Sequence, residues 1–493
     1  MEISGKVCVT SQPPSRTSTA ATAAARKRTA QSRLIRDMNI KDMNLTIFSG
    51  RAVGFVLAFL VLLSVTAPAI RAQGLSLIRD TEIENTIRAY AAPLFTVAGL
   101  DADAVSVHIV DDSRLNAFVA GGMNLFVNTG LLMSSDTPDA IIGVLAHETG
   151  HIAGGHLART REAVENATAE AMLAYILGAA AILAGGGQAG GAIIGTGSAI
   201  AYQSLIRYSQ AQEQSADQAA VRYLEAVGRS AEGMLDIFYK LEDQELLVAE
   251  RQDPYLRSHP LTRDRIRFVR NFVETSNYTS RTADAAELLA HRRMVAKLYA
   301  YLNSPGKTLR VYRENDTSLT ARYARAIAYY RIPDIERAIA KIDALLRDHP
   351  DDPWFHELKG QILFENGLIS LSIPPYERAV ALRPGEPLLR LGLARAQIEI
   401  NEPGFTKKAI DNLVVAARAE PNYAPHWHFM GIAYGRDQQL AQSSLALAEA
   451  SLLRNELTEA NYHAEKAKRG LKLGTPSYLR AEDIILAASH RKR

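Results

Sequence analysis

The sequence predicts an α+β domain, mostly helical with a small sheet, followed by an all-α solenoid of repeated helix pairs. From Leu75 to about Asn271, helical periods alternate with short β-like runs, whereas from about Ala285 onward one amphipathic helix follows another. The length of 493 residues, at about 150 residues per domain, also supports two or three domains. We therefore expect a presequence at 1–72, an α+β domain at 73–275, a helical linker at 276–320 and the repeats at 321–490.

The composition excludes several classes of protein. With 47% hydrophobic and 22% charged residues, the chain is neither collagen-like nor disordered, and it is not a polytopic membrane protein. The formal charge of +3 comes from residues 1–72, which carry ten Lys or Arg against three Asp or Glu. The remainder has a charge of 46 − 50 = −4, so no global basic field indicates nucleic acid as a partner.

The N-terminal segment predicts export. A basic stretch precedes the apolar run Ala52–Thr66, and small residues follow it, which is typical of a secretory signal cleaved near Ala72. A retained anchor and an Arg-rich organelle presequence are the alternatives, and Met38 or Met43 would make a more usual start. Because Cys8 is the only cysteine, the mature chain has no disulfide, and an exported compartment such as the periplasm fits best.

His147 and His151 give the sharpest chemical signal, in the run AIIGVLAHETGHIAGGHLA. On an α-helix, residues i and i+4 share one face, so both imidazoles can reach one metal ion. Glu148 lies one step round the helix, where it can activate a water beside the metal without binding the metal itself. This HExxH pattern predicts a zincin-like metalloprotease domain with one Zn²⁺ per chain.

The third metal ligand has several candidates. His156 nearly completes the pattern HExxHxxGxxH, but it falls one residue short, and on a continuous helix it would point away from His147, which favours a structural role. Glu213 is favoured because Asp217 lies four residues further along a second helix, where it could orient a metal-bound histidine. The alternative for this pair is an exposed acidic face. Three other acidic residues continue the first helix and cannot easily fold back onto the metal: Glu162, Glu165 and Glu170.

The chain from Leu75 to Asn271 resembles the HtpX and CAAX prenyl endopeptidase type of gluzincin zinc proteases. The resemblance rests on the HExxH, on the downstream ExxxD with Ala before Asp, and on NAFVAGGMNLFVNTGLL upstream. It implies that Glu213 is the third zinc ligand, that Asp217 supports the site and that Glu148 is the general base.

The motif SHPLTRDRI contains His259 and Arg265. From the residues alone, it is a Pro-rigid loop before a helix that Thr262 could cap, with a solvated histidine. The resemblance implies instead that this motif borders the active site. There His259 can reversibly block the open position of the zinc, while Arg265 faces the substrate backbone. We expect Arg265, and His259 once displaced, to stabilise the oxyanion.

The segment Asn116–Leu132 predicts a β-hairpin that turns at Gly121 and Gly122, with a second strand at Met123–Asn128 leading to the helix before the HExxH. An exposed edge strand beside the metal would bind a substrate backbone by strand addition. The alternative is an ordinary paired strand.

Residues 171–206 contain no charged side chain and eight glycines, with Gly187, Gly191 and Gly195 spaced four apart. The best apolar run, Ala171–Ala184, is too short to span a membrane. We expect a helical hairpin that covers the cleft or makes peripheral contact with a membrane or barrel surface. The alternative is transmembrane insertion.

The second half of the chain carries a repeat. Pro350, Pro384 and Pro421 are 34 and 37 residues apart and follow similar small-residue helices. A period near 34 is typical of tetratricopeptide repeats, which the sequence resembles over about 170 residues. We expect a concave groove that binds a polypeptide or a partner protein, with a passive solenoid as the alternative.

With the export signal and the repeats, the resemblance implies an exported zinc metalloendopeptidase that cleaves misassembled outer-membrane polypeptides and aids their assembly. It also implies contact with the outer-membrane assembly machinery through the repeats. One rival is a chaperone or assembly scaffold with a latent protease site. The other is a membrane-inserted protease that acts on prenylated or membrane substrates.

Overall fold

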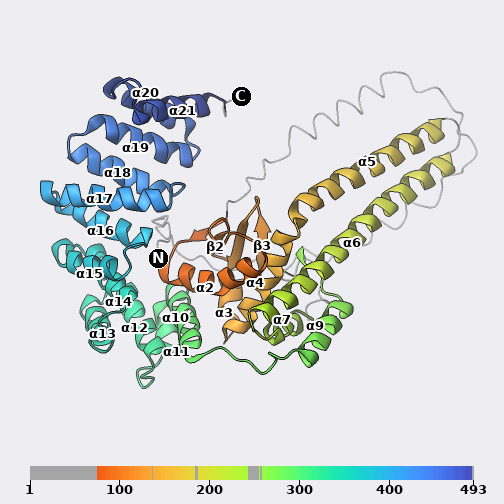
Figure 1. The fold of residues 1–493 in the computed structure, drawn as a ribbon, viewed down its shortest axis with the longest axis horizontal. Helices are drawn as coiled ribbons and strands as arrows, with labels where there is room; N and C mark the ends of the chain where they lie inside the picture. The colour runs from red at the N-terminus through yellow and green to blue at the C-terminus, as the bar shows by residue number, and fades with distance from the viewer. Residues whose placement is uncertain (1–74, 136, 184–186, 243–254, 256–257, 491–493) are drawn as a thin grey trace, which may run out of the picture. The chain divides into compact units, whose positions relative to one another are not determined.

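The structure is a computed structural model that describes residues 75–490 apart from 136, 184–186, 243–254 and 256–257 (Figure 1). The predicted export signal and Cys8 lie outside the described residues. Within the described part, the chain has the expected α+β region followed by an all-α region.

A small mixed sheet forms one side of the α+β region. Its strands are β1 (Leu77–Ile78), β2 (Ser106–Val110), β3 (Ala117–Ala120) and β4 (Asn124–Asn128). They lie in the order β1-β2-β4-β3, in which β2 and β4 are parallel and the other pairs are antiparallel. The predicted hairpin is confirmed as β3 and β4, and β3 is an edge strand of this sheet.

The helix α4 (Pro138–Ala153) lies at the centre of the first hydrophobic core and carries the HExxH. It begins with a proline in its first turn, where the missing N–H costs nothing, and nearly all of its residues up to Gly150 are buried. The helices α2 (Thr81–Val97), α6 (Gly187–Ala226) and α7 (Glu232–Glu242) pack against it. The helices α3 (Thr129–Met133) and α9 (Arg263–Thr275) contribute side chains to the same core.

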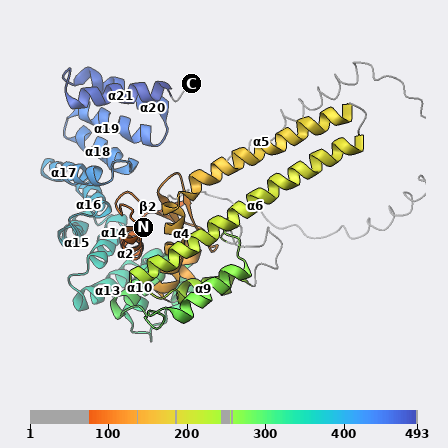
Figure 2. The same cartoon turned by 45° about the vertical axis from the view of Figure 1, so that its right-hand side comes forward.

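The predicted helical hairpin is formed by α5 (His156–Leu183) and α6 (Gly187–Ala226). The two helices lie side by side along most of their length (Figures 1 and 2). No helix in the described part of the chain is long and apolar enough to cross a membrane.

The all-α region is a series of paired helices that pack on one another in sequence order. Pro350, Pro384 and Pro421 each lie in the loop just before the first helix of a pair. The first helices are α10 (Ala285–Leu302), α11 (Pro305–Val311), α12 (Leu319–Arg331) and α13 (Ile335–Asp348). The later ones are α14 (Pro353–Glu365), α15 (Ile369–Leu382), α16 (Pro387–Ile400), α17 (Pro403–Ala419), α18 (Ala424–Arg436), α19 (Leu440–Leu453), α20 (Leu457–Gly470) and α21 (Pro476–His490).

Helix α10 contributes to two hydrophobic cores. Met294 and Leu298 pack in the core that surrounds α4, whereas Ala296 and Ala300 pack in the core of the first repeat helices. Opposite sides of one helix therefore join the α+β region to the repeats, inside the segment that the sequence predicts as a linker.

Buried charges reinforce this junction. The ammonium of Lys297 lies 2.8 Å from Oδ2 of Asp80, which caps α2, and 3.2 Å from Oε2 of Glu82. Arg293 binds Glu82 at 2.8 Å and also pairs with Asp352 at the start of α14. Although burial disfavours the ammonium, Asp80 helps to hold the pKa of Lys297 well above its usual range, so this charge is present at neutral pH.

We predict that Lys297→Met lowers the free energy of unfolding by about 3–5 kcal/mol, because it removes the shared cation from two buried carboxylates. Urea denaturation followed by circular dichroism measures the change, with the exposed Lys407→Met as the matched control. The difference in free energy of unfolding between wild type and Lys297→Met should persist at neutral pH. It should disappear as the pH rises through the raised pKa of Lys297. If Lys297→Met were as stable as Lys407→Met, the buried ion pairs of Lys297 would not stabilise the fold.

Candidate metal centre

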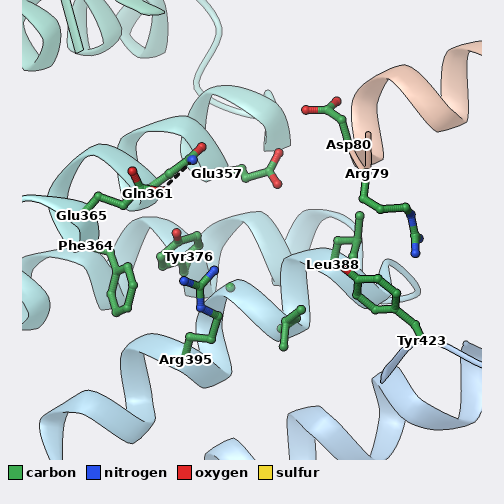
Figure 3. A pocket seen from close by; sticks show the side chains of 12 residues that line it. Arg79, Asp80, Glu357, Gln361, Phe364, Glu365, Tyr376, Leu388, Arg395 and Tyr423 are labelled. Atoms are coloured by element: carbon green, nitrogen blue, oxygen red, sulfur yellow. Dashed lines mark hydrogen bonds between the residues drawn. The ribbon is translucent and has the colours of Figure 1, made fainter. Parts of the chain in front are cut away.

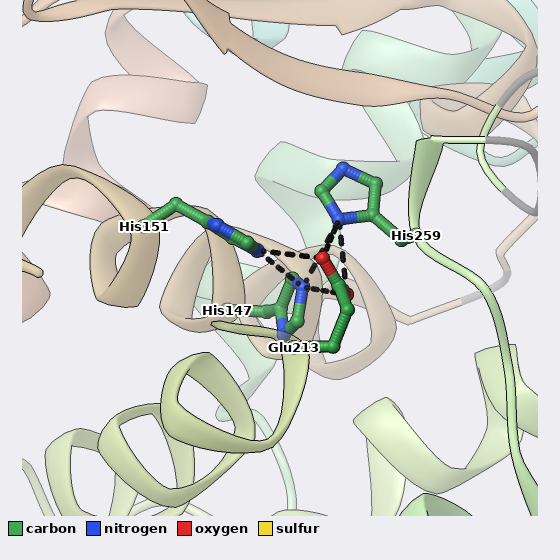
Figure 4. A group of neighbouring side chains, drawn as sticks. All are labelled: His147, His151, Glu213 and His259. Carbon is green, nitrogen blue, oxygen red and sulfur yellow. Dashed lines mark hydrogen bonds and ion pairs between the residues drawn. The ribbon is translucent and has the colours of Figure 1, made fainter. Parts of the chain in front are cut away.

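Four side chains from three segments point at one another (Figure 4). His147 and His151 come from α4, Glu213 from α6, and His259 from the loop before α9. One potential ligand atom from each lies within 4.8 Å of the other three. The sequence predicted the first three as ligands and placed His259 beside them.

The spacing of these atoms suits a tetrahedral metal ion. Nε2 of His147 lies 3.0 Å from Nε2 of His151 and 3.3 Å from Nδ1 of His259. The carboxylate of Glu213 lies 3.2–3.4 Å from all three histidines. A tetrahedron of ligands about 2.05 Å from a central zinc has edges of about 3.3 Å, so the residues present fit such an ion.

Asp217 fixes the orientation of His147. Its carboxylate is fully buried, and Oδ1 lies 2.9 Å from Nδ1 of His147, so Nε2 of the same ring is directed toward the cluster. The two residues are brought together because α6 crosses α4 closely at Gly150. A Cβ at that position would lie 2.8 Å from the carbonyl oxygen of Ala216. The predicted pairing of Asp217 with a metal-site histidine is therefore present.

Arg265 lies behind the ligands. Its side chain is buried, Nε donates to Oδ2 of Asp217 at 2.6 Å, and Nη1 lies 3.0 Å from Oε2 of Glu213. Nη1 also donates to the carbonyl of Pro260 at 2.9 Å. Two carboxylates and a carbonyl thus contact the guanidinium, and the expectation that Arg265 faces a substrate backbone stays a prediction.

Glu148 is buried and lies 3.4 Å from Nε2 of His259. Neither of its carboxylate oxygens has a hydrogen-bond partner among the described residues. Burial raises the pKa of this carboxyl group. A buried carboxylate without a partner is costly to fold, which indicates that the site is completed by something that binds there.

The His259 ring is sandwiched between the cluster and an aromatic side chain. Nδ1 faces Glu213 and His147, and Tyr255 stacks on the ring with centroids 4.7 Å apart. The backbone N–H of His259 donates to the carbonyl of Tyr255 at 2.8 Å. Thr262 caps α9 through the N–H of Arg265, as the sequence predicts. Sequence reasoning missed Tyr255, whose only signal is an aromatic residue four positions before the histidine.

His156 contacts the site from the other side. Its Nδ1 lies 3.0 Å from Nδ1 of His151. The expectation that His156 points away from the cluster is wrong, because α4 ends at Ala153 and Gly155, with a φ of 61°, turns the chain. The interpretation of His156 as a structural partner stands on this contact. Glu162 and Glu165 are exposed on α5, away from the cluster.

The charges of the cluster favour a bound cation. Burial opposes protonation of His147, but Asp217 and Glu213 outweigh it and raise its pKa to about 9. Burial and the neighbouring His147 lower the pKa of His151, and despite burial the histidines lower that of Glu213. The two carboxylates thus hold positive charge at the point where the ligand atoms converge, and a metal ion supplies that charge.

The fold and this ligand set define a metallopeptidase domain of the HExxH class, with a Glu from a second helix. Residues 78–273 match the model of Peptidase family M48.

Several related proteins match long stretches of the chain. A beta-barrel assembly-enhancing protease of Yersinia pestis is 28% identical over 375 residues, which cover 75% of each chain. The protein of the same name from Escherichia coli K12 is 25% identical over 423 residues and 81% of each chain. A putative beta-barrel assembly-enhancing protease of Vibrio cholerae is 26% identical over 252 residues, about half of each chain.

Solved structures match only in part. A structure described as YrrB, a TPR protein with an unusual peptide-binding site, is 20% identical, with 36% of this chain and 91% of that chain covered and a TM-score of 0.30. A crystal structure of MamA is 17% identical, with 34% and 94% covered and a TM-score of 0.27.

We predict that Asp217→Asn weakens metal binding by about 10–100-fold, because an amide cannot fix His147 and balance Arg265 as the carboxylate does. Competition with a chromophoric chelator measures the affinity, and circular dichroism confirms folding. Asp236→Asn, exposed on α7, is the matched control. Unchanged affinity in the folded Asp217 variant would show that His147 needs no such partner.

Proposed function

We propose that the chain is an exported, zinc-dependent endopeptidase that cleaves misassembled outer-membrane polypeptides in the periplasm. The observation that carries the proposal is the convergence of His147, His151 and Glu213 beside a buried glutamate without a hydrogen-bond partner. The client class is supported by the relatives, which are named beta-barrel assembly-enhancing proteases. The exported location is supported by the predicted signal sequence.

In this proposal His147, His151 and Glu213 hold the zinc, and His259 takes the fourth position in the closed enzyme. The zinc, when bound, supplies a Lewis acid that activates water and polarises a peptide carbonyl. A catalytic site needs the fourth position open, so His259 must swing aside. Asp217 and Arg265 hold the remaining ligands while it does so.

Glu148 is the general base. Its carboxylate lies beside the cluster without a competing hydrogen bond, so it is free to accept a proton from the attacking water. The same carboxyl group then returns the proton to the leaving amine. Its raised pKa helps both steps, because it brings the group closer to the working pH.

The edge strand β3 offers a backbone for substrate. The N–H of Asn128 donates to the carbonyl of Asn116, so residues 116, 118 and 120 face β4 in the antiparallel ladder. Ala117 and Val119 therefore direct their N–H and C=O groups away from β4. Because β3 packs against α4, an extended peptide added there runs past the HExxH helix.

The repeats offer a second contact for polypeptide. A pocket in this region has aromatic, cationic and acidic walls and is bordered by Arg79 and Asp80 from the start of the α+β region (Figure 3). Such mixed walls suit a protein segment, which carries both apolar and charged groups. The other side chains that line the pocket and are labelled in the figure are Glu357, Gln361, Phe364, Glu365, Tyr376, Leu388, Arg395 and Tyr423.

A second candidate function is an assembly scaffold whose protease site stays shut. The position of His259 within the ligand cluster favours it, because a fourth protein ligand would exclude the catalytic water. The two functions differ in whether purified protein cleaves a client.

We predict that Glu148→Gln lowers kcat/KM for an unfolded β-barrel polypeptide by at least about 100-fold, because the amide cannot take the proton. A cleavage time course with zinc-loaded protein measures it, and metal analysis should show that zinc is retained. Equal cleavage by wild type and variant would remove Glu148 from the mechanism. No cleavage by either protein would favour the scaffold.

In the same assay, His259→Ala should cleave faster than wild type, because it opens the fourth position. His349→Ala, exposed in the repeats, is the control. Slower cleavage by a zinc-loaded His259→Ala protein would mean that this histidine assists the reaction rather than blocking it.

We predict that Val119→Pro raises KM by roughly fivefold with little loss of stability, because it removes an outward-facing N–H worth about 1 kcal/mol but no bond to β4. Steady-state kinetics and thermal unfolding measure the two effects. Val119→Ala keeps the N–H and is the control. A KM equal to that of Val119→Ala would exclude strand addition at this residue.

A further inference from the structure

The outer part of the α5/α6 hairpin is distinct from the metal cluster and takes no part in the proposed reaction. We call residues 171–183 and 187–201 the apolar arm. The sequence from 171 to 206 contains no Asp, Glu, Lys or Arg. Charged residues return immediately outside it, at Glu170 and Arg207. Figures 1 and 2 show the two helices running side by side.

The apolar arm exposes large apolar side chains that a protein in water usually buries. On α5, Met172, Leu173, Tyr175 and Leu177 are 53–59% exposed. At about 100° per residue, these four side chains spread over about 200° of the helix circumference, and the buried Ala174 lies on the remaining side. A helix that covers another protein surface needs only one apolar face, whereas a helix that is apolar all round is suited to a hydrocarbon environment.

Small residues lie where the two helices meet. Ala174 on α5 and Ala201 on α6 are buried, while Ile193 and Ile200 on α6 are exposed. Small side chains inside and large apolar side chains outside are typical of helix pairs packed in lipid, because lipid tails solvate the large side chains.

The length of the arm limits how far it can extend into a lipid bilayer. The thirteen residues 171–183 are about 20 Å long at a rise of 1.5 Å per residue. A bilayer has a hydrocarbon core of about 30 Å, so one leaflet is about 15 Å thick. The arm is therefore long enough for one leaflet and too short for two, in agreement with the lack of a spanning helix in the described part of the chain.

We propose that the apolar arm inserts into one leaflet of a lipid bilayer, with acyl chains in contact with Leu173, Leu177 and Ile193. The chain is then a monotopic protein, held at a lipid surface by a helical hairpin. This inference does not rest on the proposed protease activity, because it concerns only the surface of the arm.

An environment-sensitive fluorophore tests the proposal in the full chain. Cys8→Ser removes the only cysteine, so Leu173→Cys or Ile193→Cys gives a single labelling site for a nitrobenzoxadiazole probe. With phosphatidylethanolamine and phosphatidylglycerol vesicles, we expect blue-shifted emission that spin labels on the acyl chains quench. The matched control is Leu479→Cys, an equally exposed leucine on α21, where no change is expected.

A second variant keeps the test independent of the label. Leu173→Ser combined with Ile193→Ser should weaken the vesicle affinity of the arm by at least about tenfold, a loss of about 1.4 kcal/mol, because two large apolar side chains leave the lipid. Leu440→Ser combined with Leu479→Ser is the control. In the labelling experiment, the probe at Leu173 reports the arm itself, so vesicle binding through residues 52–66 cannot imitate insertion there.

Three results would overturn the proposal. The first is that the emission of the probe at both positions stays that of a water-exposed fluorophore when vesicles are added. The second is a blue shift with an unfolded polypeptide in the absence of lipid, and the third is a blue shift that depends on protein concentration alone. The second result would assign the arm to client binding, and the third to contact with another copy of the chain.

Discussion

The arrangement of the metal cluster depends on one buried carboxylate. Asp217 contacts His147 on α4 and Arg265 on α9, and it lies one helical turn from Glu213 on α6. Three segments far apart in the sequence therefore meet at a single side chain with no exposure to solvent. A buried ion is tolerated only when all its partners are in place, so these contacts specify how α4, α6 and α9 pack.

A second set of buried charges joins the α+β region to the repeats. Lys297 and Arg293 on α10 bind Asp80 and Glu82 at the start of α2, while neighbouring residues of α10 enter both hydrophobic cores. The boundary between the α+β pattern and the repeat pattern in the sequence is therefore not a boundary in the packing of the protein. The pocket bordered by Arg79 and Asp80 lies beside the same junction, so residues of the α+β region and of the repeats line it together.

Much of the site follows from local geometry and could therefore be predicted. His147, Glu148 and His151 are related by the pitch of one helix, and so are Glu213 and Asp217. The same reasoning gave the β3/β4 hairpin, whose turn needs the positive φ of Gly121 and Gly122.

The remaining features depend on contacts between segments, which no local pattern encodes. Arg265 turns inward because Asp217 and Glu213 on a different helix lie within its reach. His156 faces His151 because the helix breaks at Gly155 rather than continuing. Tyr255 acts through its ring packing on His259, and a single aromatic residue in a loop gives no periodic signal.

The 40-residue helix α6 connects the apolar arm to the metal site. It is held against α4 where Ala216 meets Gly150, about 35 Å along the helix from Ile193 but only about 5 Å from Glu213, at 1.5 Å per residue. A rigid tilt about that contact is scaled down roughly sevenfold between the arm and the ligand, because displacement is proportional to distance from the pivot. A displacement of several ångströms at Ile193 would therefore shift Glu213 by less than about one ångström, which would leave the ligand set assembled.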